Sequence, residues 1–324
     1  MTTFKEIRGT AVQSVSSDPS NPEVGQIWYN NSIGVLKGYD LTLDAWASGG
    51  NMGTARRYMG GCGTQTAGLA FGGYTTTNVA STEEYDGSTW TAGGNIGTSR
   101  RLLAGAGIQT AGLGFGGYGG GNLSATEEYD GSTWTAGGNL GTARANLAGC
   151  GLQTAGLAFG GTITASVANT EEYDGASWTA GGSLSTARQL LGNAGTQTAG
   201  LAFGGTTTYP SLTDTTEEYN GTSWSGGGNM NTARSSLAGA GTQTLALGFG
   251  GALVGPTDTN ITEEYNGTSW TNSTSLTTAR RYLGGCGTQT AGLAFGGITT
   301  TNQSATEEYT SAFLSTKTIT TSTS

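Results

Sequence analysis

One internal repeat constrains what this chain of 324 residues can fold into. The triplet Phe-Gly-Gly recurs at intervals of 44, 44, 44, 46 and 46 residues, and each copy is preceded by an arginine and followed by Glu-Glu-Tyr. The copies begin at Phe71, Phe115, Phe159, Phe203, Phe249 and Phe295. A fixed period of this length indicates an architecture in which each repeat supplies one structural unit. The sequence therefore predicts six similar units.

Each unit divides into four short runs separated by turn signals. In the second unit these runs are LAGAG, GLGFGG, TEEYD and the segment that begins at Trp134. Asp-Gly or Asn-Gly stands between the third and fourth runs, which is a strong signal for a tight hairpin. Frequent glycine leaves no ten-residue segment with helical periodicity. Four antiparallel strands in each unit of about 45 residues predict an all-β fold, a six-bladed β-propeller of four-stranded blades.

The first run of each unit is rich in small residues, as strands that converge on a central axis require. Cysteine and alanine exchange at one position of this run, which favours simple packing over metal binding or disulfide formation. The residues at that position are Cys62, Ala106, Cys150, Ala194, Ala240 and Cys286. The aromatic residues of the later runs are expected to fill the wider space between blades.

The two ends of the repeat array complement each other. The last unit continues past Tyr309 without a tryptophan, whereas Trp46 stands 44 residues before Trp90. We therefore expect an N-terminal strand near residues 40–48 to complete the last blade, which would remove an exposed sheet edge. The predicted organisation is an attachment segment at residues 1–30, a propeller at 31–310 with its blades at about 52–309, and a tail at 311–324.

Two resemblances follow from these motifs. A glycine pair after an apolar run, then a tyrosine and then a tryptophan, repeated over residues 46–309, resembles the kelch family of β-propellers. Residues 21–39, NPEVGQIWYNNSIGVLKGY, resemble a stretch of structural proteins from tailed bacteriophages, particularly marine ones. The first resemblance implies a kelch-like propeller, and the second implies a place in a virion.

Composition argues against several classes of function. The net charge of −9 makes nucleic acid an unfavourable partner, since phosphate binding needs a basic surface. The chain shows no apolar run that could insert into a membrane and no secretory signal at its N-terminus. It contains no histidine, the commonest metal ligand and general base, so neither metal nor cofactor is expected. Kelch-type propellers include a copper oxidase that depends on histidine, and this chain departs from that pattern.

The acidic residues of the repeat also point away from catalysis. Sialidases are six-bladed and carry a repeated Asp-containing turn, but YDGSTW is one residue shorter than their pattern. A glycosidase needs one pair of carboxylates in distinct environments, whereas the Glu-Glu pair here occurs in every unit. A structural role for these pairs is the simpler interpretation, and we expect the protein not to be an enzyme.

A ring of arginines leaves two interpretations open. In an antiparallel meander the segment that joins two blades lies at the same end as the connection between the second and third strands, so these arginines should surround the axis there. They either capture an anion at the channel mouth or pair with glutamates of the repeat. The residues are Arg56, Arg100, Arg144, Arg188, Arg234 and Arg280. The neighbouring Arg57, Arg101 and Arg281 are expected to be solvated.

The segment between Phe-Gly-Gly and Glu-Glu-Tyr differs in sequence from unit to unit and is longest at residues 206–216 and 252–262. Loops held by a rigid scaffold often carry recognition, although loops also diverge without any function. Tyrosine there could stack on sugar rings. The candidate ligand-binding residues are Tyr74, Asn78, Tyr118, Asn122, Tyr209, Asp214, Asp258 and Asn260.

The combined expectation is a non-enzymatic phage virion protein, a tail fibre or tail-appendage adhesin located in the virion. Its propeller would present one face to a host-surface glycan or protein, and its N-terminal segment would bind other virion proteins. The alternatives are a capsid or tail decoration protein that binds only virion subunits, and a glycan-cleaving enzyme. Self-association into a homo-oligomer stays open, because no heptads are present that would enforce it.

Overall fold

The computed structural model describes residues 12–255 and 257–319 of the chain. The chain divides into two compact units, a larger one at Ala45–Thr310 and a smaller one formed by Met1–Asp44 together with Ser311–Ser324. Residues 31–44, which the repeat pattern assigned to the propeller, belong to the smaller unit because strand β3 (Val35–Thr42) pairs with strand β32 (Phe313–Thr318) there. No helix in the described part of the chain is long and apolar enough to cross a membrane.

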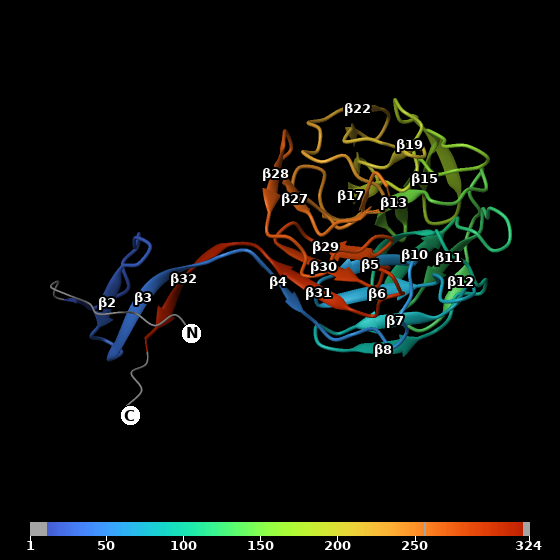
Figure 1. Cartoon of the computed structure of the whole chain (residues 1–324). Coiled ribbons are helices and arrows are strands. Elements are labelled where there is room, and N and C mark those ends of the chain that lie inside the picture. Colours follow the sequence, from blue (N-terminus) through green and yellow to red (C-terminus); the bar gives the residue numbers. More distant parts are fainter. Residues whose placement is uncertain (1–11, 256, 320–324) are drawn as a thin grey trace. The chain divides into compact units, whose positions relative to one another are not determined.

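The larger unit is a six-bladed β-propeller of four-stranded antiparallel sheets, as the repeat predicts (Figure 1). Blade 1 comprises β5 (Gly60–Thr64), β6 (Ala67–Phe71), β7 (Thr82–Tyr85) and β8 (Trp90–Gly93). Blade 2 comprises β9 (Ala104–Ile108), β10 (Ala111–Phe115), β11 (Thr126–Tyr129) and β12 (Trp134–Ala136). Blade 3 comprises β13 (Ala148–Leu152), β14 (Ala155–Phe159), β15 (Thr170–Tyr173) and β16 (Trp178–Gly181).

The next two blades carry the longer loops, each of which forms a small two-stranded hairpin of its own. Blade 4 comprises β17 (Gly192–Thr196), β18 (Ala199–Phe203), β21 (Thr216–Tyr219) and β22 (Trp224–Gly226), with the hairpin β19 (Thr206–Thr208) and β20 (Ser211–Leu212). Blade 5 comprises β23 (Ala238–Gly241), β24 (Ala246–Phe249), β27 (Thr262–Tyr265) and β28 (Trp270–Ser273), with the hairpin β25 (Ala252–Leu253) and β26 (Thr257–Asp258).

Blade 6 is completed by the N-terminal part of the larger unit. It comprises β29 (Gly284–Gly287), β30 (Ala291–Phe295), β31 (Thr306–Thr310) and β4 (Ala45–Ser48). In Figure 1 the blue strand β4 lies beside the red strand β31, and the register places Trp46 opposite Tyr309. The expected closure is therefore present, and the edge of the last blade is paired.

The blades pack on one another through a repeated aromatic contact. Each tryptophan lies against the tyrosine of its own blade and the phenylalanine of the preceding one. Trp134, for example, is 5.0 Å from Tyr129 and 4.7 Å from Phe71 between ring centres. Its Nε1–H donates to the Thr82 hydroxyl of blade 1 at 3.0 Å, so the indole is both packed and hydrogen-bonded across the interface.

The glycine pair of the repeat allows a close approach between blades. Gly72 adopts φ +63° after strand β6, and a Cβ there would lie 2.7 Å from the backbone oxygen of Arg100. The amide of Gly73 donates to that same oxygen at 2.8 Å. A larger residue would separate the end of β6 from the segment that enters blade 2, which explains why the pair recurs in every unit.

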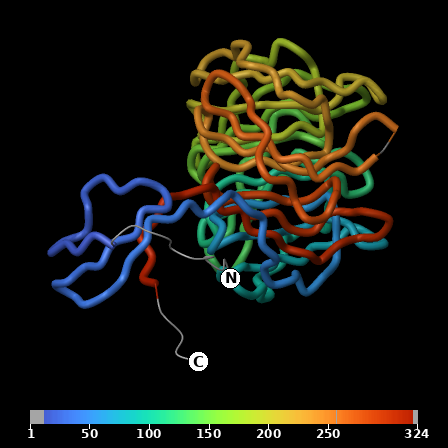
Figure 2. The backbone as a smooth tube through the Cα atoms, turned by 60° about the vertical axis from the view of Figure 1, so that its left-hand side comes forward, coloured from blue at the N-terminus to red at the C-terminus, as the bar shows by residue number. Residues whose placement is uncertain are grey.

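The smaller unit contains a four-stranded sheet in the order β1 (Gln13–Val15), β2 (Ile27–Asn30), β3, β32. Strands β3 and β32 bring the two ends of the chain together within this unit, and the red segment runs beside the blue one in Figure 2. Trp28 is fully buried, and its indole N–H, the Asn30 amide and the Lys37 ammonium all donate to the carboxylate of Asp18. The Lys37 hydrogen bond is the main reason why the pKa of Asp18 falls to about 2.

We predict that Trp46→Ala destabilises the propeller by about 3–5 kcal/mol, because the indole fills the closing interface against Phe249 and Tyr309. Denaturant unfolding of the full chain measures the change. Tyr209→Ala is the control, since that side chain is 67% exposed and its loss should cost less than about 0.5 kcal/mol. Equal midpoints for the two variants would show that β4 does not close the ring.

Candidate functional site

The six arginines of the ring are fully buried and pair with the first glutamate of their own blade's Thr-Glu-Glu-Tyr strand. The nitrogen–oxygen distances lie between 2.9 and 3.3 Å for Arg56–Glu83, Arg100–Glu127, Arg144–Glu171, Arg188–Glu217, Arg234–Glu263 and Arg280–Glu307. Burial lowers the pKa of each arginine, and the facing glutamate opposes that shift. Of the two interpretations left open, these contacts match pairing rather than a guanidinium ring open to an anion.

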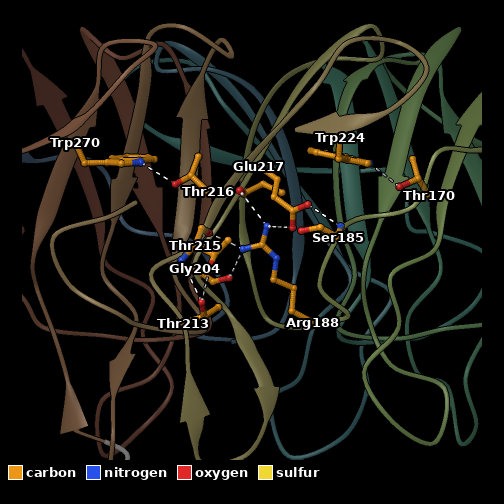
Figure 3. A network of polar contacts seen from close by, with 11 residues as sticks. Thr170, Ser185, Arg188, Gly204, Thr213, Thr215, Thr216, Glu217, Trp224 and Trp270 are labelled. Atoms are coloured by element: carbon orange, nitrogen blue, oxygen red, sulfur yellow. Dashed lines mark hydrogen bonds and ion pairs between the residues drawn. The ribbon is translucent and has the colours of Figure 1, made fainter. Parts of the chain in front are cut away.

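Blade 4 shows how completely such an arginine is used (Figure 3). Arg188 donates to Glu217 Oε1 at 2.9 Å and to the backbone oxygens of Gly204 and Thr215 at 3.1 and 2.6 Å. Glu217 Oε2 accepts the backbone N–H of Ser185 at 2.7 Å, in the segment that enters the blade. The pair therefore ties the connection between blades to the start of strand β21.

The second glutamate of each pair accepts a hydrogen bond from a tyrosine of the following blade. The Tyr173 hydroxyl donates to Glu128 at 2.5 Å, and the Tyr265 hydroxyl donates to Glu218 at 2.7 Å. Burial first, and the facing glutamate next, raise the pKa of these tyrosines to about 12. Both carboxylates of the repeat thus lie in contacts that recur around the ring, and the described residues contain no group of three His, Cys, Asp or Glu side chains arranged to hold a metal ion.

The end of the propeller that carries these inter-blade segments and the loops between the second and third strands is called here the loop face. At its centre, six residues form a closed ring of backbone hydrogen bonds, in which each N–H donates to the carbonyl of the preceding blade at 2.8–3.1 Å. These residues are Tyr58, Leu102, Asn146, Leu190, Ser236 and Tyr282. The ring outlines the mouth of the central channel.

All six mouth residues have φ between 55° and 60°, in the left-handed region. Every other residue with positive φ in the described chain is a glycine. A side chain in this region costs on the order of 1 kcal/mol for residues other than glycine and asparagine. A chain with 60 glycines nevertheless places no glycine at this mouth: the six positions hold two tyrosines, two leucines, one asparagine and one serine. Side chains are retained where the backbone would favour their absence.

Behind the mouth lies a cavity of about 120 Å³ lined by the mouth residues, and a second one of about 100 Å³ follows along the channel. The walls of the second cavity include the three cysteines, which are buried thiols; burial raises the pKa of Cys62 and Cys150 to about 12. Asn193 borders both cavities at a repeat position that is glycine in the other five blades. The Oγ of Ser236 is buried beside the first cavity without a hydrogen-bond partner.

The candidate residues of blades 1 and 2 lie together on the loop face, in roles that differ from the expectation. Asn78 donates to the backbone oxygen of Tyr118, and Asn122 donates to that of Thr162, so both amides fasten one loop to the next. Tyr74 is covered on its ring by the guanidiniums of Arg57 and Arg101, at 4.9 and 4.7 Å from the ring centre. The expected stacking of a sugar on Tyr74 is thus opposed by arginines already in place.

The candidate residues of blades 4 and 5 lie in the longer loops. Tyr209 is 67% exposed, at the tip of the β19–β20 hairpin. Asp214 accepts a hydrogen bond from Asn229 at 3.4 Å, and Asn260 donates to the backbone oxygen of Leu276 at 2.9 Å. Asp258 pairs with Arg281 and so meets the neighbouring blade 6.

Two sets of residues escaped the sequence interpretation. The six mouth residues stand two positions after each ring arginine, and their variation in an otherwise repeated segment was the available signal. Arg57, Arg101 and Arg281 were expected to be solvated, yet each lies over at least one tyrosine ring. Their clustering depends on which blades are neighbours, which single repeats do not reveal.

Comparison with known proteins adds no assignment, since neither a protein-family model nor a curated protein matches this chain. The propeller is shown by its coordinates, and its resemblance to kelch proteins rests on the repeat.

We predict that Arg100→Ala lowers the free energy of unfolding by about 3–5 kcal/mol, because it leaves the buried carboxylate of Glu127 without its partner. The adjacent Arg101→Ala should lower the free energy of unfolding by only about 1 kcal/mol, because this half-buried side chain contributes only cation–π contacts and one hydrogen bond. Denaturant unfolding of both variants tests the contrast. Equal losses would refute a structural role confined to the ring.

We also predict a loss of stability in alkali. Tyr85, Tyr129, Tyr173, Tyr219 and Tyr265 have folded-state pKa values raised from 10.0 to about 12. Their contribution to the free energy of unfolding is complete below the tyrosine pKa of the unfolded chain, and it is lost as pH rises from 10.0 towards 12. The melting temperature should fall across this window, together with the rise of tyrosinate absorbance. Full ionisation of the tyrosines near pH 10.0 in a protein that stays folded would contradict this.

Proposed function

We propose that this protein is a non-enzymatic binding protein that recognises a host-surface ligand through its loop face. The observation that carries the proposal is the set of six mouth residues, which keep differing side chains at left-handed backbone positions. Backbone strain of this kind collects at binding sites, where the surrounding structure compensates for it. The closed ring of hydrogen bonds provides that compensation here.

The distribution of repeated and varied residues supports the same proposal. The repeated Arg, Glu, Thr, Tyr and Trp side chains meet one another inside the blades and between them. The varied loops and the mouth share one end of the propeller, while the opposite end carries the Asp-Gly turns, such as the one in which Asp86 accepts the amides of Ser88 and Thr89. A rigid scaffold with variation confined to one end suits recognition.

We further propose that the protein is part of a tailed-phage virion and is attached through its smaller unit. The support is the resemblance of residues 21–39 to phage structural proteins, and the way Trp28, Asn30 and Lys37 of that stretch meet at Asp18. Several large apolar side chains of this unit are exposed, which suits contact with other subunits. They include Val24, Tyr29, Ile33, Leu41, Leu43, Phe313 and Leu314. A kelch-like ancestry of the propeller is part of this proposal.

The proposal predicts that shortening the two long loops abolishes host-cell binding while the propeller stays folded. Residues 207–211 and 253–257 are replaced by short Gly-Ser linkers, because Thr216 and Thr262 hold Trp270 and Trp46 and must be kept. Binding of labelled full-length protein to candidate host cells is the measurement. Leu152→Ser, at an exposed hairpin of the opposite end, is the matched control and should bind normally.

Unchanged binding by the loop variant would contradict recognition through these loops. Absence of cell binding by the wild type, with incorporation into particles lost on deletion of the smaller unit, would identify a decoration protein instead. Release of reducing sugar from host envelopes would contradict the non-enzymatic part.

A further inference from the structure

The positive charge that the propeller does not use in its ring is confined to three neighbouring blades. Residues 45–310 contain no lysine and nine arginines, of which six are the buried ring. The remaining three are Arg281, Arg57 and Arg101, at the same repeat position in blades 6, 1 and 2. Blades 3, 4 and 5 carry Ala145, Gln189 and Ser235 there. The propeller thus places its three arginines outside the buried ring on one side of the channel mouth.

These arginines form one continuous stack with tyrosines, called here the arginine–tyrosine arc. Arg57 lies over Tyr58 and Tyr74 at 5.2 and 4.9 Å from the ring centres, and Arg101 lies over Tyr74 and Tyr118 at 4.7 and 5.0 Å. Tyr58 also packs on Tyr282 at 4.2 Å, and Arg281 lies over Tyr282 at 5.7 Å. In order, the arc is Arg281, Tyr282, Tyr58, Arg57, Tyr74, Arg101 and Tyr118.

The stack orients the guanidiniums without neutralising two of them. Arg57 donates to the amide oxygen of Asn302 at 2.6 Å, and Arg101 donates to that of Asn78 at 3.1 Å. Among the described residues, neither forms an ion pair with a carboxylate, whereas Arg281 pairs with Asp258. Cation–π contact uses the face of a guanidinium and leaves its in-plane N–H donors directed outward. Arg57 and Arg101 are therefore a pre-oriented pair of charged donors.

The adjoining cavity is uncharged. Tyr58 and Tyr282 belong to both the arc and the wall of the cavity of about 120 Å³. The other polar side chains of that wall are Asn146, Asn193 and Ser236, and the hydroxyl of Ser236, which is 95% buried, has no hydrogen-bond partner. The site thus pairs two cations at its edge with neutral hydrogen-bonding groups inside.

We propose that the arginine–tyrosine arc and the channel mouth bind an acidic saccharide. Its anionic group lies against Arg57 and Arg101, and its hydroxyl groups face Asn146 and Ser236. This inference rests on the proposed function, since it names the chemistry of the host-surface ligand. A carboxylate or a phosphate on the sugar offers the same acceptor geometry to a guanidinium. Nucleic acid fits less well, because its bases need open aromatic faces and two guanidiniums already lie over the Tyr74 ring.

The test is the binding of the full chain to three polymers by surface plasmon resonance. Polygalacturonate supplies carboxylate, dextran phosphate supplies phosphate, and dextran supplies neither. We expect binding to one or both acidic polymers, weakening as salt is raised, and no binding to dextran. Which acidic polymer binds more tightly distinguishes a uronate-type ligand from a phosphorylated one.

Two variants copy residues that other blades carry at the same position. The double variant Arg57→Ala with Arg101→Ala reproduces Ala145, and the double glutamine variant reproduces Gln189, so at least one should stay folded and melt cooperatively. We expect affinity for the acidic polymer to fall at least about tenfold, since two charge-assisted hydrogen bonds are lost. Ser235→Ala, at the same repeat position in blade 5, is the control from the uncharged side and should leave affinity unchanged.

The inference is overturned if the wild type binds neither acidic polymer, or if it binds dextran or single-stranded DNA as tightly as the acidic polymer. It is also overturned if a folded arginine variant binds the acidic polymer with wild-type affinity. Host-cell binding by the same proteins separates it from the proposed function. Cells bound by the arginine variant but not by the loop variant would refute the acidic saccharide and leave adhesion standing. Acidic polymer bound at the arc by a protein that no cell captures would support the site and count against adhesion.

Discussion

The buried ion pair between the ring arginine and the first glutamate of each blade is the contact on which the rest of the propeller depends. Removing two charges from water is costly, so each pair must be completed by further hydrogen bonds. In blade 4 these are supplied by the end of one strand, the start of another and the incoming inter-blade segment. The pair consequently holds three parts of the backbone in one geometry, and six such pairs set the shape of the loop face.

The same constraint positions the residues that we assign to recognition. The residue directly after the ring arginine is an arginine of the arc in blades 6, 1 and 2, and the next residue forms the channel mouth. Because the preceding arginine is immobilised, these two positions have little conformational freedom and can differ in side chain without disturbing the blade. The geometry of the proposed site therefore depends on a structural contact, as sites built on rigid elements require.

Much of the fold could be predicted from the sequence because it repeats. The period gave the number of blades, and the offset between Trp46 and Trp90 located the closing strand. The start of the larger unit could not be placed, because the pairing of β3 with β32 joins segments outside the repeat that carry no shared pattern. Periodicity predicts contacts that recur in every unit, but it cannot predict a contact that occurs only once.

The candidate site was less predictable for the same reason. The varied segments do lie between the second and third strands of each blade, as the repeat predicts, and their role in binding stays a prediction. The sequence predicts Tyr74 as a platform for sugar, but arginines from its own blade and the next already lie over its ring. Recognising this needs the distance between equivalent positions of adjacent blades, which no single repeat contains. The left-handed conformation of the mouth was also hidden, because its residues are not glycine.

A substitution scan of the full chain tests the central claim most directly, by scoring every position separately for folded protein and for ligand binding. The account predicts that substitutions of the repeated Arg, Glu, Tyr and Trp residues reduce the amount of folded protein and ligand binding together. It predicts that ligand binding is lost while the protein stays folded when substitutions fall in the mouth residues, the arginine–tyrosine arc or the two long loops. Binding-specific positions spread over the Asp-Gly turns of the opposite end, with the loop face insensitive, would contradict it.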